Sequence, residues 1–251
     1  MAERPTENQG TERGMADGRT VRGEAVQAMC ALVVKGAFDA SLIPTFAAQG
    51  DTLDIMWAPT TVIQDRLAEG GRPDMVLVLS GAMDTLEAEG LIHPESRVDV
   101  CRSRYGVAVK AGAPHPRIDT LEAFKSTLTG ARSVAYSRAG ASGIYFAGLL
   151  PRLGIADAVN ARATIIPAGF TATKLVSGEA DIAVQQISEL MVVPGIEVVG
   201  PYPEGAQEET TFCAAILREA TAPDAAQRFL SILTDPSAAE AYRSSGLEPA
   251  S

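Results

Sequence analysis

Small hydroxyl residues and glycines follow several apolar runs of this sequence, at positions where helices are expected to begin. Thr60 and Thr61 follow the run 52–59, and Ser80 and Gly81 lie at the end of the next such run. The first N–H groups of a helix have no acceptor within it, and its N-terminus carries a partial positive charge. Such helix starts bind anions without a metal ion, and nearby hydroxyl or amide side chains complete the shell.

The second half of the chain offers further candidate ligands of the same kind. They lie in the loop that follows the run 133–137 and at the end of a late apolar run, and they are Ser137, Ala141, Ser142, Gly143, Gln185 and Gln186. Taken singly, each hydroxyl is explained slightly better as a helix N-cap, which contributes about 1 kcal/mol. As a set at the carboxyl ends of strands, where open α/β sheets bind their ligands, they favour a small-anion site.

One cation lies where the first apolar run ends. Lys35 directly follows the run 26–34. An ammonium at the edge of a pocket would make a charge-assisted hydrogen bond to a carboxylate ligand. The alternative is an ordinary solvated lysine at a helix start, since lysines are mostly exposed. A Lys35 side chain in the pocket would favour a carboxylate ligand, and one that faces solvent would favour a compact oxyanion.

Composition excludes several classes of function. The 21 Lys and Arg against 31 Asp and Glu give a formal charge of -10, which repels nucleic acid and anionic lipid. Aromatic residues are 5% of the chain, so base-stacking platforms are not expected. Three widely spaced cysteines form no CxxC motif or Cys/His cluster, so we expect neither disulfides nor a metal site. No phosphate-binding GxxxxGK[ST] loop is present, and we expect no cofactor.

The N-terminus bears on the compartment. Residues 1–23 are polar and charged throughout, which predicts a disordered arm and lacks the apolar core of a secretory signal. The sequence contains no uninterrupted run of about 18 apolar residues, so we expect no membrane-spanning segment. As written, the sequence predicts a cytoplasmic protein; if a signal had been removed, the protein would be periplasmic.

Apolar runs alternate with amphipathic stretches along the rest of the 251 residues. The runs 26–34, 52–59 and 74–80 predict strands that are each followed by a helix. A second set of strands is predicted at 133–137, 164–168 and 180–186, and further strands begin at Ser103, Ile196 and Thr210. This alternation predicts an α/β fold whose parallel strands are flanked by helices.

Three segments carry a family resemblance. They are SRAGASGIYFAGLLPRLGI in the second half, LVSGEADIAVQQISE after it, and SAAEAYRSSGLEP near the end. Together with the strand ends above, they resemble the molybdate-binding type of the periplasmic-binding-protein fold, the soluble receptors of anion-importing ABC transporters. The resemblance implies a type II, two-lobed α/β fold. Lobe one would comprise residues 24–104 plus 212–251 and lobe two residues 105–211, with two crossing strands as the hinge.

The resemblance implies that a small anion binds in the cleft between the lobes. A transporter permease would be a partner only if the protein is exported. The sequence departs from the molybdate binders at two places. Ala31 to Lys35 replace a pair of small hydroxyl residues after the first strand, and Gln185 and Gln186 stand where a tyrosine is common. Amides both donate and accept hydrogen bonds, which suits a carboxylate or carbonyl ligand better than a fully deprotonated oxyanion.

Some proteins that resemble this family are isomerases, notably aconitate isomerase, which moves a double bond by proton transfer. An enzyme of this kind needs a base and groups that hold carboxylates. If this chain is such an isomerase, Lys35 is the candidate catalytic residue, followed by Tyr136 and Glu189. We expect Glu189 to cap a helix or face solvent. His93 and His115 precede prolines in predicted loops, so we expect no histidine base. A sensor that closes on its ligand is a third possible class.

Overall fold

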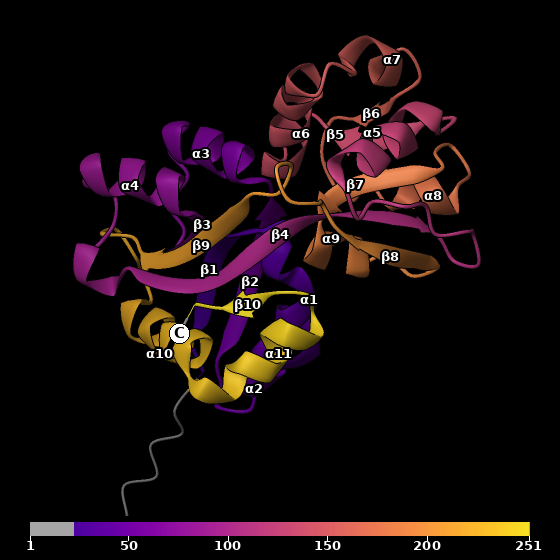
Figure 1. The fold of residues 1–251 in the computed structure, drawn as a ribbon. Coiled ribbons are helices and arrows are strands. Elements are labelled where there is room, and N and C mark those ends of the chain that lie inside the picture. Colours follow the sequence, from indigo (N-terminus) through magenta and orange to yellow (C-terminus); the bar gives the residue numbers. More distant parts are fainter. Residues whose placement is uncertain (1–22, 251) are drawn as a thin grey trace, which may run out of the picture.

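The computed structural model describes residues 23–250. The arm expected over residues 1–23 therefore lies outside the described residues, except for Gly23. Figure 1 shows two α/β lobes, one below and to the left and one at the upper right, joined by long strands.

Lobe one is built from three βα units. Strands β1 (Ala25–Ala31), β2 (Thr52–Ala58) and β3 (Met75–Leu79) are parallel, in the order β2-β1-β3. Their helices run on directly from the strand ends. Strand β1 is followed by the short helices η1 (Leu32–Val34), α1 (Lys35–Ala37), η2 (Phe38–Leu42) and α2 (Ile43–Ala47). Strand β2 is followed by α3 (Thr60–Ala68), and β3 by α4 (Ser80–Ala88). The last part of the chain returns to this lobe as α10 (Pro223–Thr234), η4 (Pro236–Ala238), α11 (Ala239–Ser244) and β10 (Glu248–Pro249).

Lobe two repeats the pattern with shorter elements. Strands β5 (Val134–Ser137), β6 (Thr164–Ile166) and β7 (Ile182–Gln186) are parallel, in the order β7-β5-β6. The helices of this lobe are α5 (Leu121–Gly130), α6 (Ala141–Arg152), α7 (Ala156–Asn160), α8 (Thr173–Val176) and α9 (Ile187–Met191).

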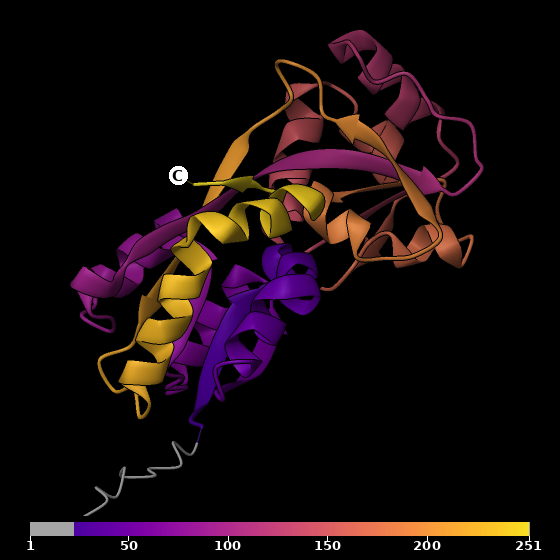
Figure 2. The same ribbon diagram turned by 90° about the horizontal axis from the view of Figure 1, so that it is seen from below.

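Strand β4 (Val98–Lys110), which follows η3 (Pro94–Ser96), runs through both lobes. Its first half pairs antiparallel with β9 (Glu209–Ile216), and its second half pairs with β7 and β8 (Ile196–Pro201). Figures 1 and 2 show β4 as the long magenta strand between the lobes. The chain returns through residues 202–208, and β9 itself stays in the sheet of lobe one, between β3 and β4.

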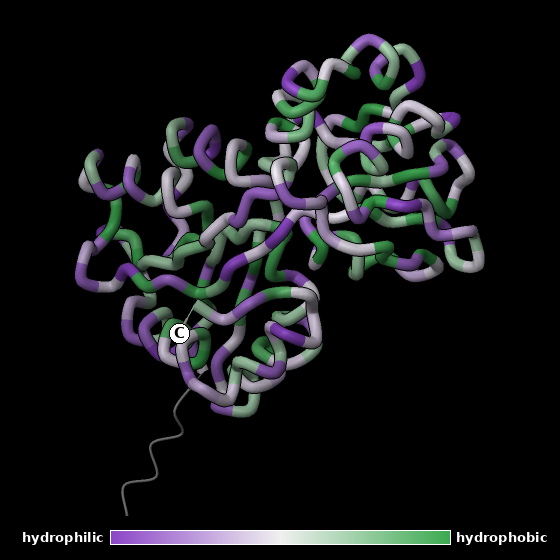
Figure 3. The backbone as a smooth tube through the Cα atoms, viewed as in Figure 1, coloured by the Kyte–Doolittle hydropathy of each residue, from purple (hydrophilic) through white to green (hydrophobic). Residues whose placement is uncertain are grey.

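Each lobe has its own hydrophobic cores. In lobe one, the aromatic rings of Phe38, Phe46 and Phe229 pack together between the sheet and α10. In lobe two, Phe124, Phe146 and Tyr202 form the corresponding centre. Figure 3 shows hydrophobic stretches along the strands, whereas the outer helices alternate between hydrophobic and hydrophilic residues. The central strands β3, β5 and β7 are buried on both faces, and the outer helices bury the side that faces the sheet.

The first βα unit differs from its sequence prediction. The predicted strand 26–34 ends at Ala31, and Leu32–Val34 form a short 3₁₀ turn that remains buried. All three residues are apolar because they pack on every side, so a run of this kind does not reveal where extended backbone ends. In residues 23–250 no helix is long and apolar enough to cross a membrane.

Candidate functional site

A cavity of about 20 Å³ lies between the lobes, at the carboxyl ends of β1, β5 and β7. This volume holds about one water molecule or one small functional group. Strand ends and helix starts of both lobes form its wall. The lining residues are Ala31, Leu32, Pro59, Thr60, Ser137, Gly140, Ala141, Ser142, Gly169, Gln185, Gln186, Glu189 and Phe212.

Lobe one contributes the N-terminus of α3 and the Thr60 hydroxyl. Pro59 precedes the helix in an extended conformation, so the first N–H groups of α3 have no acceptor within the helix. The Thr60 Oγ1 accepts a hydrogen bond from the Leu79 N–H at 3.3 Å, which leaves the hydroxyl proton free to donate. Thr60 thus lies at the predicted edge of the sheet, and its role as a ligand donor stays a prediction.

Lobe two contributes the end of β5 and the N-terminus of α6. Ser137 is the last residue of β5, and its buried Oγ has no hydrogen-bond partner among the described residues. Ala141 and Ser142 open α6 and line the cavity. Gly143 does not line it: a Cβ at this position would lie 1.7 Å from the Ser137 carbonyl oxygen, so this glycine lets α6 approach β5 closely.

Thr61 joins the lobes instead of lining the cavity. Its Oγ1 donates to the carbonyl oxygen of Ala139 in lobe two at 2.8 Å. A direct bond between the start of α3 and the loop before α6 holds the two lobes together beside the cavity. The conformation described here is therefore a closed one.

The two glutamines at the end of β7 have different hydrogen bonds, because successive strand residues point in opposite directions. The Gln185 Oε1 accepts from the N–H and hydroxyl of Thr171 at 2.8 and 2.9 Å, and its Nε2 donates to the Gly169 carbonyl at 2.9 Å. The Gln186 Nε2 donates to the Thr210 Oγ1 at 3.0 Å, whereas its buried Oε1 has no described partner. Gln185 thus holds the loop 169–171, and Gln186 keeps a free acceptor.

Among residues 23–250, Glu189 is the one ionisable residue that lines the cavity. Burial raises the pKa of its carboxyl from 4.5 to about 7, although hydrogen bonds from the Gln185 side chain and the Gln186 backbone act in the opposite direction. A carboxyl with this pKa exchanges a proton readily near neutral pH. The expectation that Glu189 caps a helix agrees with the bond from the Gln186 backbone, because Gln186 is the N-cap of α9 and Glu189 lies in its first turn. The expectation that it faces solvent is met only in part, because its half-buried side chain also lines the cavity.

A wider groove of about 680 Å³ adjoins the cavity and shares Thr60 and Ala141 with it. Ser80 and Gly81, at the start of α4, line this groove and not the cavity. The wall also includes tyrosine, glutamate and threonine side chains, namely Tyr105, Tyr145, Glu208, Glu209, Thr210 and Thr211.

Lys35 lies outside both the cavity and the groove. Its Nζ forms an ion pair with Asp39 at 2.8 Å and lies 4.8 Å from the centre of the Trp57 ring. The 3₁₀ turn after β1 places Lys35 three residues beyond the sheet edge, and Leu32 lines the cavity in its place. The structure thus brings together Thr60, Ser137, Ala141, Ser142, Gln185 and Gln186 of the predicted set, and it leaves out Lys35.

Tyr136, the other base considered, is also occupied elsewhere. Its hydroxyl donates to the Asn160 Oδ1 at 2.9 Å, and burial raises its pKa. His93 and His115 lie in loops and pair with Glu95 and Glu197. Among residues 23–250 no cluster of three or more metal-ligating side chains occurs.

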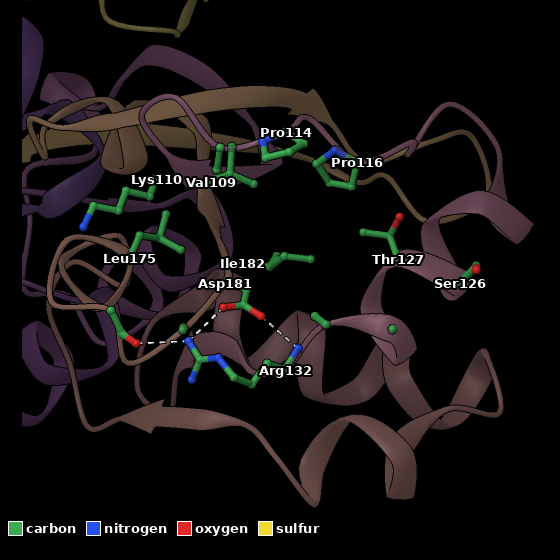
Figure 4. A pocket seen from close by; sticks show the side chains of 15 residues that line it. Val109, Lys110, Pro114, Pro116, Ser126, Thr127, Arg132, Leu175, Asp181 and Ile182 are labelled. Carbon is green, nitrogen blue, oxygen red and sulfur yellow. Dashed lines mark hydrogen bonds and ion pairs between the residues drawn. The ribbon is translucent and has the colours of Figure 1, made fainter.

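A third concavity, of about 630 Å³, lies at the far end of lobe two. Figure 4 shows mainly apolar side chains there, with Arg132 and Asp181 directed at each other across one side. These two residues form an ion pair at 2.8 Å, and Arg132 also donates to the Gly178 carbonyl at 3.0 Å. The third charged lining residue, Lys110, donates to the Val176 carbonyl at 3.5 Å, and no residue of the predicted site lines this concavity.

The lobes, the crossing strand and the interlobe cavity define the periplasmic-binding-protein fold. The sequence profile of the bacterial extracellular solute-binding proteins matches residues 16–248, and the chain belongs to this family. Similar solved structures include the periplasmic molybdate-binding protein of Azotobacter vinelandii, with a TM-score of 0.73 and 18% identity over 88% of this chain and 98% of that one. The sulfate-binding protein SubI of Mycobacterium tuberculosis H37Rv gives a TM-score of 0.71 and 17% identity over 90% and 87% of the two chains.

A much closer sequence relative is an enzyme. The chain is 41% identical over 208 residues to the aconitate isomerase of a Pseudomonas species. The matched region covers 80% of this chain and 79% of that protein. The solved structures therefore support the fold, and the sequence relative adds a specific activity to consider.

Proposed function

We propose that this protein is an isomerase that moves a double bond in a small unsaturated di- or tricarboxylate by proton transfer. The observation that carries the proposal is the Glu189 carboxyl, which lies in the interlobe cavity and has a pKa of about 7. The 41% identity to an aconitate isomerase supports the same reaction.

The reaction needs a base, a stabilised intermediate and an acid. Ionised Glu189 removes a proton from the CH₂ group between a carboxyl and the double bond. The electron pair of that C–H bond forms a new C=C bond, and the original π electrons move toward the far carbon and its carboxyl. Protonated Glu189 then returns the proton to that carbon, so atoms and charge balance. The donors at Ser137, Thr60 and the start of α6 are suited to stabilise the oxygen that gains charge.

The volume of the cavity supports a division of the substrate between two spaces. About 20 Å³ encloses one functional group, and the groove of about 680 Å³ that shares Thr60 and Ala141 has room for the rest. Substrate entry then requires the lobes to part, because Thr61 and Ala139 bond across the mouth.

The test is exchange of substrate protons in deuterated water, followed by NMR with cis- and trans-aconitate. We expect the chain to catalyse both exchange and interconversion, and Glu189→Gln to slow both by about 10²-fold to 10⁴-fold. Glu122→Gln is the matched control, because Glu122 is 82% exposed on α5, far along the chain from the cavity. Full activity of the Glu189→Gln variant would refute the assigned base.

The alternative is a receptor that binds a small anion without turnover. The neutral donors Thr60 and Ser137 in the cavity wall support it, as does membership of a solute-binding family. A thermal-shift panel of molybdate, tungstate, sulfate, phosphate, citrate and both aconitates separates the two. A ligand at a hundred times its Kd adds about 2.7 kcal/mol. Stabilisation by molybdate or tungstate alone favours the receptor, and such a receptor would serve a permease only if exported.

A further inference from the structure

The orientation of the Gln186 amide is fixed from outside the cavity. Thr210 on β9 donates its hydroxyl proton to the Ser103 carbonyl on β4 at 3.3 Å. With its proton engaged, the Thr210 Oγ1 acts toward Gln186 as an acceptor, so the amide atom at 3.0 Å from it is Nε2. This chain of bonds leaves Oε1 as the free atom of the amide.

Two unpartnered atoms of opposite kinds thus belong to the wall of the cavity. The Gln186 Oε1 accepts and cannot donate, whereas the Ser137 hydroxyl has a proton to donate. Gln186 and Ser137 are 2% and 1% exposed, and a buried polar group without a partner costs about 1 to 3 kcal/mol. A neutral carboxyl group matches the pair, because its O–H donates to an amide oxygen and its C=O accepts from a hydroxyl.

Charge favours the same ligand form. Among the described residues, no Lys, Arg or His lines the cavity or the adjoining groove, whereas Glu189, Glu208 and Glu209 do. Glu209, in the groove, is paired with Arg102 and Arg104 at 3.5 and 3.7 Å, so the enclosed cavity has only the carboxyl of Glu189 in its wall. An ionised carboxylate that enters the enclosed cavity loses its hydration without gaining a cation.

We propose that the enclosed carboxyl of the substrate is bound as the neutral acid, with its O–H donating to the Gln186 Oε1, and that Thr210 is the positioning residue that holds this acceptor in place. This inference deepens the proposed function and rests on it for the substrate class. A neutral carboxyl also eases removal of the adjacent proton, because the intermediate then carries one negative charge fewer.

The test measures proton uptake on binding of trans-aconitate. Calorimetric titrations at pH 7 in two buffers of different ionisation enthalpy give the number of protons taken up. The Glu189→Gln variant is the background, because it removes the protein carboxyl that would otherwise take up a proton itself. We expect uptake of about one proton in this background and a value near zero in the Glu189→Gln, Gln186→Leu double variant. No uptake in the single variant would overturn the inference.

Thr210→Val gives a second readout outside the enclosed cavity, and Thr211→Val is its matched control because both threonines line the groove. The variant frees the Gln186 amide to rotate and to offer its N–H, so we expect the affinity for trans-aconitate relative to sulfate to fall at least tenfold. An unchanged affinity ratio would contradict the positioning role.

The two proposals fail separately. Proton exchange into substrate without proton uptake on binding would retain the isomerase and refute the neutral carboxyl. Proton uptake without exchange would retain the bound neutral acid and refute the isomerase.

Discussion

Replacing Glu189 by glutamine should change how the stability of the protein depends on pH. The carboxyl has a pKa of about 7 in the native state and an ordinary value of 4.5. Between these values the native state holds a proton that the unfolded state has released, so the free energy of unfolding falls as pH rises. For one group with these two pKa values, the loss between pH 5 and pH 8 is about 2.5 kcal/mol. The Glu189→Gln variant has no titrating carboxyl at this position, so its free energy of unfolding does not show this fall.

Urea unfolding followed by far-UV circular dichroism at pH 5, 6, 7 and 8 measures the effect. The difference in unfolding free energy between Glu189→Gln and the parent should grow by about 2.5 kcal/mol over this range, whereas Glu122→Gln should run parallel to the parent. A constant difference would mean that Glu189 titrates as an exposed glutamate. The assignment of Glu189 as the proton-transfer residue would then lose its physical basis.

Three further substitutions test the site and its support. Thr61→Val removes the bond to Ala139, and we expect calorimetry to show ligand affinity about fivefold weaker, or about 1 kcal/mol; an unchanged Kd would exclude a role in closure. Gly143→Ala places a methyl group 1.7 Å from the Ser137 carbonyl oxygen, so thermal unfolding should show a loss of at least about 2 kcal/mol, and parental stability would contradict the close approach. Burial raises the pKa of the Asp74 carboxyl, but four hydrogen bonds to it lower the pKa overall. Asp74→Asn should therefore reduce the free energy of unfolding by about 3 kcal/mol at pH 7 and by progressively less as pH falls below 4. An equal loss at pH 7 and below pH 4 would argue against an ionised Asp74.

The strand-end rule predicted the part of the site that depends on local sequence. Ser137 and Thr60 lie at the cavity because a parallel strand ends beside each of them, and this ending is visible in the sequence as an apolar run followed by a small polar residue. The same rule placed Lys35 incorrectly, because the apolar run before it contains a buried 3₁₀ turn as well as a strand. Periodicity does not distinguish the two.

Glu189 could not be assigned from the sequence because its environment is made by distant segments. The residue follows β7 on a five-residue helix, and the wall around it comes from the ends of β1, β5 and β9. A glutamate in the first turn of a helix is usually explained by the helix dipole, which predicts an exposed side chain. The late GEADIAVQQISE segment contained the signal, since it carries a carboxyl three residues after two buried amides.

In the proposed reaction, the small cavity explains how a protein with a formal charge of -10 would bind an acid although no Lys, Arg or His of the described residues lines the site. Only one carboxyl has to leave water, because about 20 Å³ admits a single group, and that carboxyl loses its charge by taking up a proton. The remaining carboxylates of a di- or tricarboxylate can stay hydrated in the wider groove beside Thr60 and Ala141. Closure of the lobes then encloses the one carboxyl whose adjacent C–H bond must break, next to the carboxyl group of Glu189 that can accept the proton.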